Sequence, residues 1–461
     1  MTPPASTICC AGCGYVAGPA DPYPFRCPRA GTDDADHVLT RVLGLVGARF
    51  PEGDEANPFL RYRALMHSYH VATARGPGDT AYPHRDTTHR DTDYRDLVAS
   101  LDAAVAAVDG HGFRATPFCR SRELSDALGF DPKGGVWVKD ETGNVSGSHK
   151  GRHLMGVLIH LAVMERCGLT DPARRPDLAI ASCGNAALAA AVVARAGGWQ
   201  LTVFVPPEAD PRVIRRLHDL GAKVVTCRRE PGIPGDPAYH RLRQELDAGA
   251  LPFTTQGPEN GLAIEGGLTL GYELVTDLAH DRLDHLIIQV GGGALASSTI
   301  QALREAADLG AITRLPRIHT VQTTGAHPLE RAYQRVRALL PPEPAPDAIR
   351  ETMAEAAQRR SAFMRPWPRE PASVATGILD DETYDWRAVV EGMLATGGRP
   401  LVVSEASLRQ AGRLAAARTG IPVDPTGSSG LAGLLEMRRS GQVGDHDRVA
   451  VLFTGLERGT P

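Results

Sequence analysis

Short apolar runs alternate with helical patterns along most of this chain, and this alternation constrains the fold more than any other feature. The runs that predict strands, several of them rich in valine and isoleucine, are 178–181, 201–205, 223–226, 286–290, 318–322, 401–403 and 449–453. Helical patterns follow three of them, over 186–196, through Val213 and Leu217, and over 294–307. Strands that alternate with helices form parallel sheets covered on both faces. The sequence therefore predicts an α/β protein.

Two regions stand outside this alternation. Residues 1–40 form a head that is rich in Cys, Pro and Asp and has little helical or strand periodicity. Further along, the proline-rich break Pro341–Pro346 and a charged helical pattern over 349–363 indicate an insertion near residues 327–372. With 461 residues, the chain is long enough for two or three domains of about 150 residues each.

Charge and hydropathy exclude two classes of partner. Lys and Arg total 50 against 54 Asp and Glu, a net charge of −4, and no long basic run is present. We expect no binding to nucleic acid, because such binding depends on clustered cations. The longest apolar stretches, such as Leu188–Ala194, fall far short of the roughly 20 residues that cross a bilayer. The first residues show no secretory pattern, so we expect a cytoplasmic protein without membrane association.

Lys150 lies where a loop gives way to a helix. The segment 144–152 precedes a series of apolar residues at helical spacing, namely Leu154, Val157, Leu158, Leu161 and Met164. The helix dipole disfavours a cation at the N-terminus of a helix, so this lysine is either solvated or kept partly neutral for chemistry. Taken alone, a single lysine is most simply interpreted as a surface residue.

Two strand-to-helix turns carry groups suited to anions. The turn Ser182–Asn185 offers a hydroxyl, a side-chain amide and free backbone N–H groups, which suit a carboxylate. The turn Gly291–Gly293 lets the backbone close on a phosphate. The simpler interpretations are a capped turn and a structural glycine turn. The second turn lacks the GxGxxG spacing of dinucleotide-binding turns, which disfavours a nicotinamide-dependent oxidoreductase.

The last predicted strand is followed by Thr454 and Gly455. Ligands of open α/β sheets bind beyond the carboxyl ends of the strands, so these two residues are candidates for a binding site. The alternative interpretation is an ordinary strand end.

In this order, the four segments resemble the pyridoxal-phosphate (PLP) enzymes of fold type II, the superfamily of the tryptophan synthase β-subunit and threonine synthase. The resemblance covers about Thr116 to Gly455 and includes the lysine motif Ser/Thr-Gly-Ser-Phe-Lys, with His149 at the aromatic position. It implies that Lys150 bonds to the PLP aldehyde and acts as acid and base. The other residues that it implies are Asn185 for the phenolic oxygen of PLP, Gly291, Gly292, Gly293 and Ala294 for its phosphate, Thr454 for its pyridine nitrogen, and Ser182, Cys183, Gly184 and Asn185 for the substrate carboxylate.

The resemblance also implies a domain arrangement. We expect two open parallel-sheet α/β domains with the active site between them, and a small Cys-rich N-terminal segment. A homodimer is also expected. The expected boundaries are a zinc-ribbon-like head over 1–40, the N-terminal part of the large domain over 41–145, the PLP-lysine region and small domain over 146–270, and the rest of the large domain, with the phosphate loop, over 271–461.

Within the superfamily, threonine synthase and its relatives are the most similar. Segments 321–325, 373–378 and 424–430 resemble segments that flank the active site there. In this family a neutral residue such as Thr454 beside the pyridine nitrogen is associated with elimination and replacement. We therefore expect a PLP-dependent lyase that eliminates a β-substituent from a small amino acid, as serine and threonine ammonia-lyases do. The alternatives are β- or γ-replacement, as in threonine synthase, and a non-catalytic zinc-ribbon interaction protein on the same scaffold.

Two departures from the family pattern leave the substrate open. The family's Lys-Asp-Arg-Gly becomes Lys150-Gly-Arg-His153. Cys183 stands in the substrate loop where Ser or Thr is common.

The cysteines of the head suggest a metal site. Four of the eight cysteines lie in the first 27 residues, which is typical of metal binding rather than of a disulfide scaffold. Some members of the threonine synthase group begin with a zinc-ribbon-like segment, but here Ala30 replaces one cysteine of the second pair. A metal-free ribbon is the alternative, and Cys9 is an alternative to Cys10. The ligands expected for tetrahedral Zn²⁺ are Cys10, Cys13, Cys27 and His37.

Overall fold

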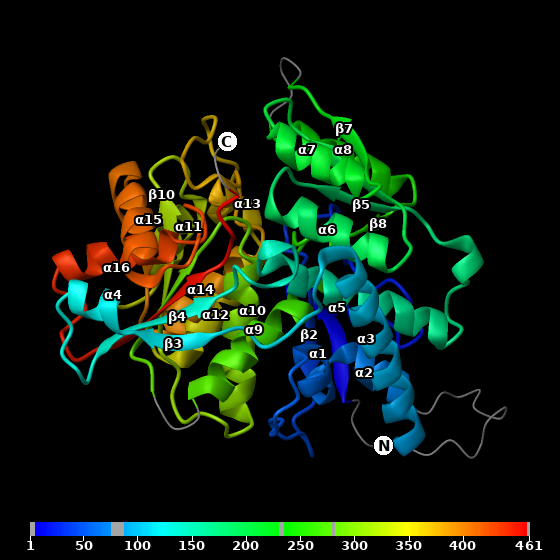
Figure 1. Cartoon of the computed structure of the whole chain (residues 1–461), viewed down its shortest axis with the longest axis horizontal. Coiled ribbons are helices and arrows are strands. Elements are labelled where there is room, and N and C mark those ends of the chain that lie inside the picture. Colours follow the sequence, from blue (N-terminus) through cyan, green and yellow to red (C-terminus); the bar gives the residue numbers. More distant parts are fainter. Residues whose placement is uncertain (1–4, 75–86, 230–234, 279–281, 459–461) are drawn as a thin grey trace.

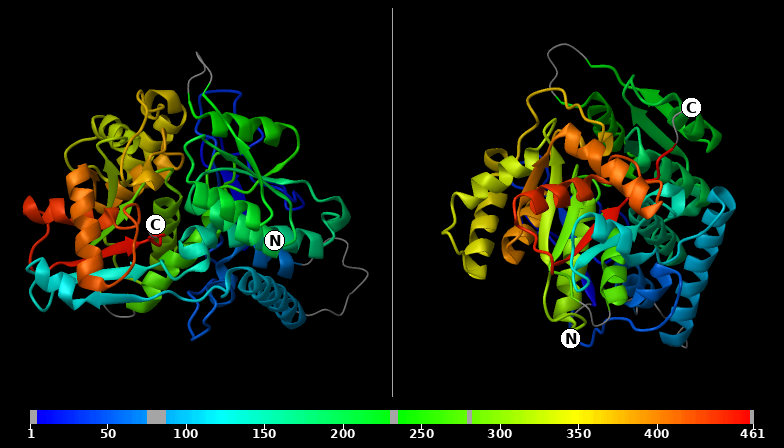
Figure 2. Two further views of the ribbon diagram at one scale, coloured as in Figure 1. Left: turned by 45° about the horizontal axis from the view of Figure 1, so that its top comes forward. Right: turned by 60° about the vertical axis from the view of Figure 1, so that its left-hand side comes forward.

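The computed structural model describes residues 5–74, 87–229, 235–278 and 282–458. Figure 1 shows two α/β lobes side by side, with the C-terminal half of the chain in one lobe and the green segment around β5 to β8 in the other. The left view of Figure 2 shows the same separation. Among the helices of the described residues, none is long and apolar enough to cross a membrane.

The smaller lobe is built on four parallel strands in the order β7-β6-β5-β8. These strands are β5 (Leu178–Ala181), β6 (Leu201–Val205), β7 (Lys223–Thr226) and β8 (Leu251–Pro252). The helices that accompany them are α5 (Lys150–Arg166), α6 (Asn185–Ala196), α7 (Pro211–Asp219) and α8 (Pro237–Asp247). All five residues of β6 are buried, as expected for a strand covered on both faces.

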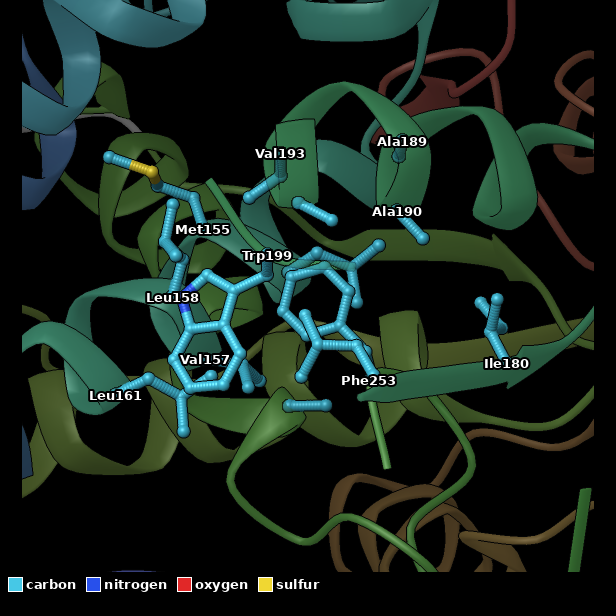
Figure 3. Close-up of a cluster of buried hydrophobic side chains, with 14 of the residues drawn as sticks. Met155, Val157, Leu158, Leu161, Ile180, Ala189, Ala190, Val193, Trp199 and Phe253 are labelled. Atoms are coloured by element: carbon cyan, nitrogen blue, oxygen red, sulfur yellow. The ribbon is translucent and has the colours of Figure 1, made fainter. Parts of the chain in front are cut away.

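Apolar side chains from α5, α6 and the small sheet form one core. Figure 3 shows Leu158 and Val193 from the two helices beside Trp199 and Phe253, and all four are buried. Because α5 contributes many apolar residues to this core, its first turn is held in a fixed position relative to the small sheet.

The larger lobe is built on six strands in the order β11-β10-β9-β12-β4-β3, and all neighbouring pairs are parallel except β3 with β4. The strands are β3 (Phe118–Ser121), β4 (Gly135–Asp140), β9 (His285–Gln289), β10 (Arg317–Thr323), β11 (Pro400–Val403) and β12 (Arg448–Phe453). The helices that accompany them are α4 (Arg122–Ala127), α9 (Ala263–Leu278), α10 (Ala294–Asp308), α11 (Pro328–Arg337), α14 (Trp386–Thr396), α15 (Glu405–Thr419) and α16 (Ser429–Arg439).

Alternate residues of β9 show how this sheet is covered on both faces. Leu286 and Ile288 belong to the core that includes Leu295 of α10 and Val389 of α14. Ile287, between them, belongs to the core formed with α15 and α16. This two-residue alternation is the geometry of a strand between two layers of helices.

The N-terminal part of the chain packs mainly on the smaller lobe. The strands β1 (Ser6–Cys10) and β2 (Leu39–Leu43) form an antiparallel pair. They are followed by α1 (Pro58–Arg61), α2 (His67–Thr73) and α3 (Thr87–Asp109). Tyr94, Val98 and Val105 of α3 are buried in the core that α5 and α6 supply.

The insertion forms the helices α12 (Pro346–Ala357) and α13 (Arg360–Phe363), and the head docks on it. The Asp36 backbone N–H donates to the Ala357 carbonyl at 2.7 Å, and the Arg360 N–H donates to the Asp34 carbonyl at 2.8 Å. The predicted charged helix is therefore confirmed, and it provides a surface for the first 40 residues.

The seven strands predicted from apolar runs are confirmed within one residue at each end, as β5, β6, β7, β9, β10, β11 and β12. Sequence reasoning did not predict β1, β2, β3, β4 or β8, and β1 lies in the head, which was expected to have little strand periodicity. Strand β4 has the sequence Gly-Val-Trp-Val-Lys-Asp, in which two charged residues end the short apolar run. The burial of Lys139 is tolerated because its Nζ donates to Glu273 at 2.7 Å.

Candidate active site

Lys150 is the first residue of α5, and the loop before it is held against the end of β12. Ser148 pairs with Gly455 in an isolated antiparallel bridge. The His149 backbone N–H donates to the Thr454 carbonyl at 3.2 Å. A helix of the smaller lobe therefore begins at the carboxyl end of a central strand of the larger lobe, where ligands of open α/β sheets bind.

The amine of Lys150 lies among neutral and acidic groups. Its Nζ donates to Thr255 Oγ1 at 3.2 Å. Burial lowers the pKa of the amine from its ordinary value of 10.5, while the charges of Asp380 and Asp385 oppose this shift. The net shift is downward, so the neutral, nucleophilic form of the amine is more accessible here than at a solvated lysine.

The turn Gly291–Gly293, called the glycine loop below, opens α10 and faces an acidic side chain. Gly293 has a φ of 104°, in the left-handed region that glycine adopts without strain. A Cβ added to Gly291 would stand 2.3 Å from Asp380 Oδ2, so this position has no room for a side chain. The Gly292 N–H stabilises the ionised form of that carboxyl, although burial raises its pKa to about 6.

Residues 380–385, called the acidic segment below, cover the glycine loop. Thr383 Oγ1 donates to the Gly291 carbonyl at 3.0 Å. The Asp385 backbone N–H donates to the Gly292 carbonyl at 3.0 Å. The Tyr384 ring lies 2.8 Å from where a Cβ on Gly292 would stand. Both neighbours of Lys150 named above, Asp380 and Asp385, therefore also border the glycine loop.

The turn Ser182–Asn185 leads from β5 into α6 and carries one exposed residue, Cys183. Asn185 is held by the larger lobe, because its Nδ2 donates to Asp424 Oδ2 at 3.4 Å and its Oδ1 accepts from Arg458. Burial raises the pKa of Asp424 to about 6. These contacts bring the turn to the end of β12.

Thr454 is buried, and its Oγ1 accepts a hydrogen bond from Gln289 Nε2 at 2.6 Å. The hydroxyl proton of Thr454 is therefore free to be donated elsewhere. Two buried polar atoms nearby, Ser148 Oγ and Gln289 Oε1, have no hydrogen-bond partner among the described residues. Buried polar atoms without partners are rare in native proteins and suit a polar ligand.

The structure thus brings the sequence-predicted residues of the site together from both lobes. Lys150 and the Ser182–Asn185 turn come from the smaller lobe, and the glycine loop and Thr454 come from the larger one. A Cβ on Gly455 would stand 2.6 Å from Asn185 Nδ2, which shows how closely the lobes approach.

Sequence reasoning missed several residues of this site. The only sequence signal for the acidic segment was its position directly after 373–378, a stretch already predicted to flank the site, and nothing local indicated that it would reach Lys150. The missed residues are Thr255, Gln289, Asp380, Asp385 and Arg458.

The four predicted metal ligands of the head also lie together. The ligand atoms of Cys10, Cys13, Cys27 and His37 are all within 4.8 Å of one another. Cys13 Sγ and Cys27 Sγ are 3.6 Å apart, as are Cys10 Sγ and His37 Nδ1. The other ring nitrogen of His37, Nε2, lies 2.8 Å from Asp33 Oδ1, the type of carboxylate contact that orients metal-ligating histidines. Cys9 is outside this cluster.

Taken together, two parallel sheets, a lysine at their junction and a glycine loop at a helix start define a two-lobed α/β enzyme with its site between the lobes. Residues 111–455 match the family model described as "Pyridoxal-phosphate dependent enzyme". The chain belongs to this family and has the fold of the fold-type II PLP enzymes.

Similar sequences include threonine synthases and L-serine dehydratases. A threonine synthase of Methanocaldococcus jannaschii is 23% identical over 341 residues, which cover 74% of each chain. An L-serine dehydratase of Saccharomyces cerevisiae strain RM11-1a is 28% identical over 205 residues, which cover 43% of this chain and 59% of the yeast protein.

Solved structures of the same fold include a T.th. threonine deaminase, with a TM-score of 0.56, 22% identity, and coverage of 80% of this chain and 99% of that one. An L-serine ammonia-lyase of Rhizomucor miehei matches with a TM-score of 0.54 and 20% identity. The match covers 74% of this chain and 93% of that one. At these identities the likeness establishes the fold.

The residues present fit pyridoxal phosphate. The aldehyde of PLP needs an amine that loses its proton readily, and burial gives Lys150 this property. Its phosphate needs backbone N–H groups at a helix start, and the glycine loop lies at the start of α10. The unpartnered atoms of Ser148, two residues before Lys150, and of Gln289, the partner of Thr454, offer further polar contacts.

Proposed function

We propose that this enzyme is a PLP-dependent lyase that eliminates a β-substituent from a small amino acid. The observation that carries the proposal is the position of Lys150, at the start of α5, between the end of β12 and the acidic segment that borders the glycine loop. The likeness to L-serine dehydratase supports deamination as the outcome.

Each residue of the site has a task in this proposal. When bound, PLP withdraws electrons from the α-carbon of the substrate. Lys150 Nζ would hold the PLP aldehyde and would accept the α-proton of the substrate. The N–H groups of Gly291, Gly292, Gly293 and Ala294 hold the phosphate, and Asn185 binds the phenolic oxygen.

Two further contacts are part of the proposal. The Thr454 hydroxyl would hold the pyridine nitrogen of PLP, and because it is neutral it would favour the unprotonated form of that nitrogen. The backbone N–H groups of the Ser182–Asn185 turn hold the substrate carboxylate at the start of α6.

A β- or γ-replacement is the second candidate function. It is favoured by the threonine synthase of Methanocaldococcus jannaschii, which matches a larger share of this chain than the yeast dehydratase does. The two candidates differ in what captures the product of elimination, water or a second substrate. Product analysis with and without an added nucleophile distinguishes them.

The first test is covalent attachment of PLP to Lys150. We expect the purified chain to show a visible absorption band with PLP, and borohydride reduction followed by peptide mass analysis to place the adduct on Lys150. Lys150→Ala should lose the adduct and at least about 10³-fold of the rate of keto-acid and ammonia formation.

Lys223→Ala is the matched control, because Lys223 is an exposed lysine of the same lobe. The control should keep both the adduct and the rate. An adduct on any other lysine, or none with PLP in excess, would contradict the proposal.

We further propose that the head binds Zn²⁺ through Cys10, Cys13, Cys27 and His37. Three sulfurs and one imidazole nitrogen within 4.8 Å of one another match a tetrahedral structural site. Metal analysis of the purified chain tests this proposal. A homodimer and a cytoplasmic location stay predictions.

A further inference from the structure

The site holds more acidic than basic side chains. Lys150 is the cationic side chain that acts on both Asp380 and Asp385. The two carboxylates also face further acids, since Asp236 and Asp381 act on Asp380. The phosphate of a bound cofactor would add to this imbalance. Buried carboxyls ionise readily only beside a positive charge, so these acids would ionise together with the binding of a further cation.

Asp385 shows the imbalance most directly. Only 4% of its surface is exposed, and its Oδ2 has no hydrogen-bond partner among the described residues. Its Cβ lies 3.1 Å from where a Cβ on Gly293 would stand, and its Oδ1 lies 2.1 Å from the corresponding position on Gly257. Gly257 follows two residues after Thr255, the partner of Lys150 Nζ. The carboxylate therefore lies between the glycine loop and the lysine.

The pKa values of both carboxyls are raised, as expected for acids in a buried position. Burial raises the pKa of Asp385 to about 8, and the charge of Asp36 adds to the shift. Burial raises the pKa of Asp380 to about 6. A cation bound beside them would lower both values, and by linkage their ionisation would favour the cation.

The surroundings of the Ser182–Asn185 turn are acidic as well. Cys183 is exposed on the turn proposed to hold the substrate carboxylate. The charged groups that act on it are Asp236, Asp380 and Glu208, and all three are acids. A substrate bound at this turn meets a negative potential, which attracts a cationic side chain and repels an anionic one.

We propose that Asp380 and Asp385 bind a second positive charge on the substrate, and that the site takes a short amino acid with an amine on its side chain. In a 2,3-diamino acid, the ammonium stands on the β-carbon, where serine carries its hydroxyl. This inference rests on the proposed function and names the substrate class of the same site. It also explains why an acidic segment covers the glycine loop instead of the cationic residues that would suit a phosphorylated substrate.

Binding is tested with two amino acids that carry no leaving group on the β-carbon. Isothermal calorimetry on the PLP-loaded enzyme compares L-2,4-diaminobutyrate with L-2-aminobutyrate, which lacks the second amine. We expect the diamino acid to bind at least about tenfold more tightly, as for a partly buried charge-assisted contact. In Asp385→Asn and Asp380→Asn this preference should fall to about threefold or less.

Asp219→Asn is the matched control, because this exposed carboxylate of the smaller lobe is not among the groups that act on Lys150, Asp380 or Asp385. It should keep the tenfold preference. Turnover is the second readout: kcat/KM for L-2,3-diaminopropionate should exceed that for L-serine, and the ratio should fall in the two Asn variants.

The outcomes separate this inference from the proposed function. An enzyme that carries PLP on Lys150 and turns over L-serine, but binds the two analogues equally, overturns the substrate class and leaves the lyase proposal in place. Equal loss of affinity for both analogues in Asp385→Asn would also overturn it, since that variant would then have a general structural defect. A chain that binds no PLP overturns both.

Discussion

Asp385 is a buried acid whose ionisation opposes folding. Its pKa is raised to about 8, mainly by burial, from an ordinary value of 3.8. Between these two values the folded protein keeps the proton and the unfolded chain has released it. The folded state therefore binds more protons, and the contribution of Asp385 to stability is present below pH 4 and is lost as the pH rises toward 8.

Asp385→Asn should consequently stabilise the PLP-free protein in alkaline solution. Asparagine has nearly the same shape and no charge to desolvate, so we expect the free energy of unfolding at pH 8 to rise by about 2 kcal/mol. The gain should be small at pH 4.5. Urea denaturation at both pH values measures it. A gain that is equal at the two pH values would show that desolvation of this carboxylate is not the cause.

Residues could be assigned to the site from the sequence only where the neighbouring sequence marks them. Lys150 and the glycine loop follow or precede regular elements and have distinctive sequences. Asp380 and Asp385 follow no strand and open no glycine turn, and their approach to Lys150 depends on a contact between segments more than 200 residues apart along the chain. Single-sequence reasoning has no access to such contacts, so the groups that suggest the substrate class were found only in the structure.

At the scale of elements, the position of Lys150 depends on how closely α5 packs against α9. A Cβ on Gly156 of α5 would stand 2.7 Å from the Cα of Gly266 in α9. A Cβ on Gly266 would stand 2.0 Å from the Arg152 carbonyl oxygen. These are backbone contacts, which cannot give way as a flexible side chain would, so the two helices can approach only because both positions are glycine.

Gly156→Ala should therefore force the helices apart. We expect the free energy of unfolding to fall by about 2 kcal/mol and the affinity for PLP to fall with it, because α5 begins at Lys150. Gly412→Ala in α15 is the control, since its nearest atom is Ser428 Oγ at 3.7 Å, an ordinary contact. It should be neutral or stabilise by up to about 1 kcal/mol, the helix preference of alanine. Equal effects of the two substitutions would contradict this account of the packing.

Strands could be predicted from the sequence where their residues form an unbroken apolar run. Strands buried on both faces, such as β6 and β9, read as apolar runs, and all seven strands predicted from such runs are present, including the partly exposed edge strand β7. The two-residue β8 is too short to leave a pattern. In β4, Lys139 and Asp140 interrupt the apolar run, and Lys139 is tolerated only because Glu273, from a distant helix, neutralises it. Tertiary pairing thus overrides the local signal.

At the scale of the whole molecule, the head connects parts of the chain that are far apart in sequence. The Gly261 N–H, in the segment before α9, donates to the Phe25 carbonyl at 2.9 Å. On the other side, Gln358 Nε2 donates to the Gly12 carbonyl at 2.6 Å, and Arg387, at the start of α14, donates to the Ala11 carbonyl. Ala11 and Gly12 lie between two of the proposed metal ligands. The metal site would therefore fix the backbone that receives α12 and α14.

Cys27→Ser should remove the metal and loosen this docking. A serine hydroxyl is a poor zinc ligand, so we expect the bound zinc to fall from about one equivalent to near zero in elemental analysis. Hydrogen exchange should then speed up at the Asp36 amide and at other amides that join the head to α12, because they lose a fixed partner. Cys167→Ser is the control, since Cys167 is exposed and lies outside the cluster, and it should change neither measurement. Full zinc content in Cys27→Ser would show that the cluster does not hold the metal through this sulfur. Unchanged exchange after loss of zinc would show that packing against the insertion alone is enough to order the head.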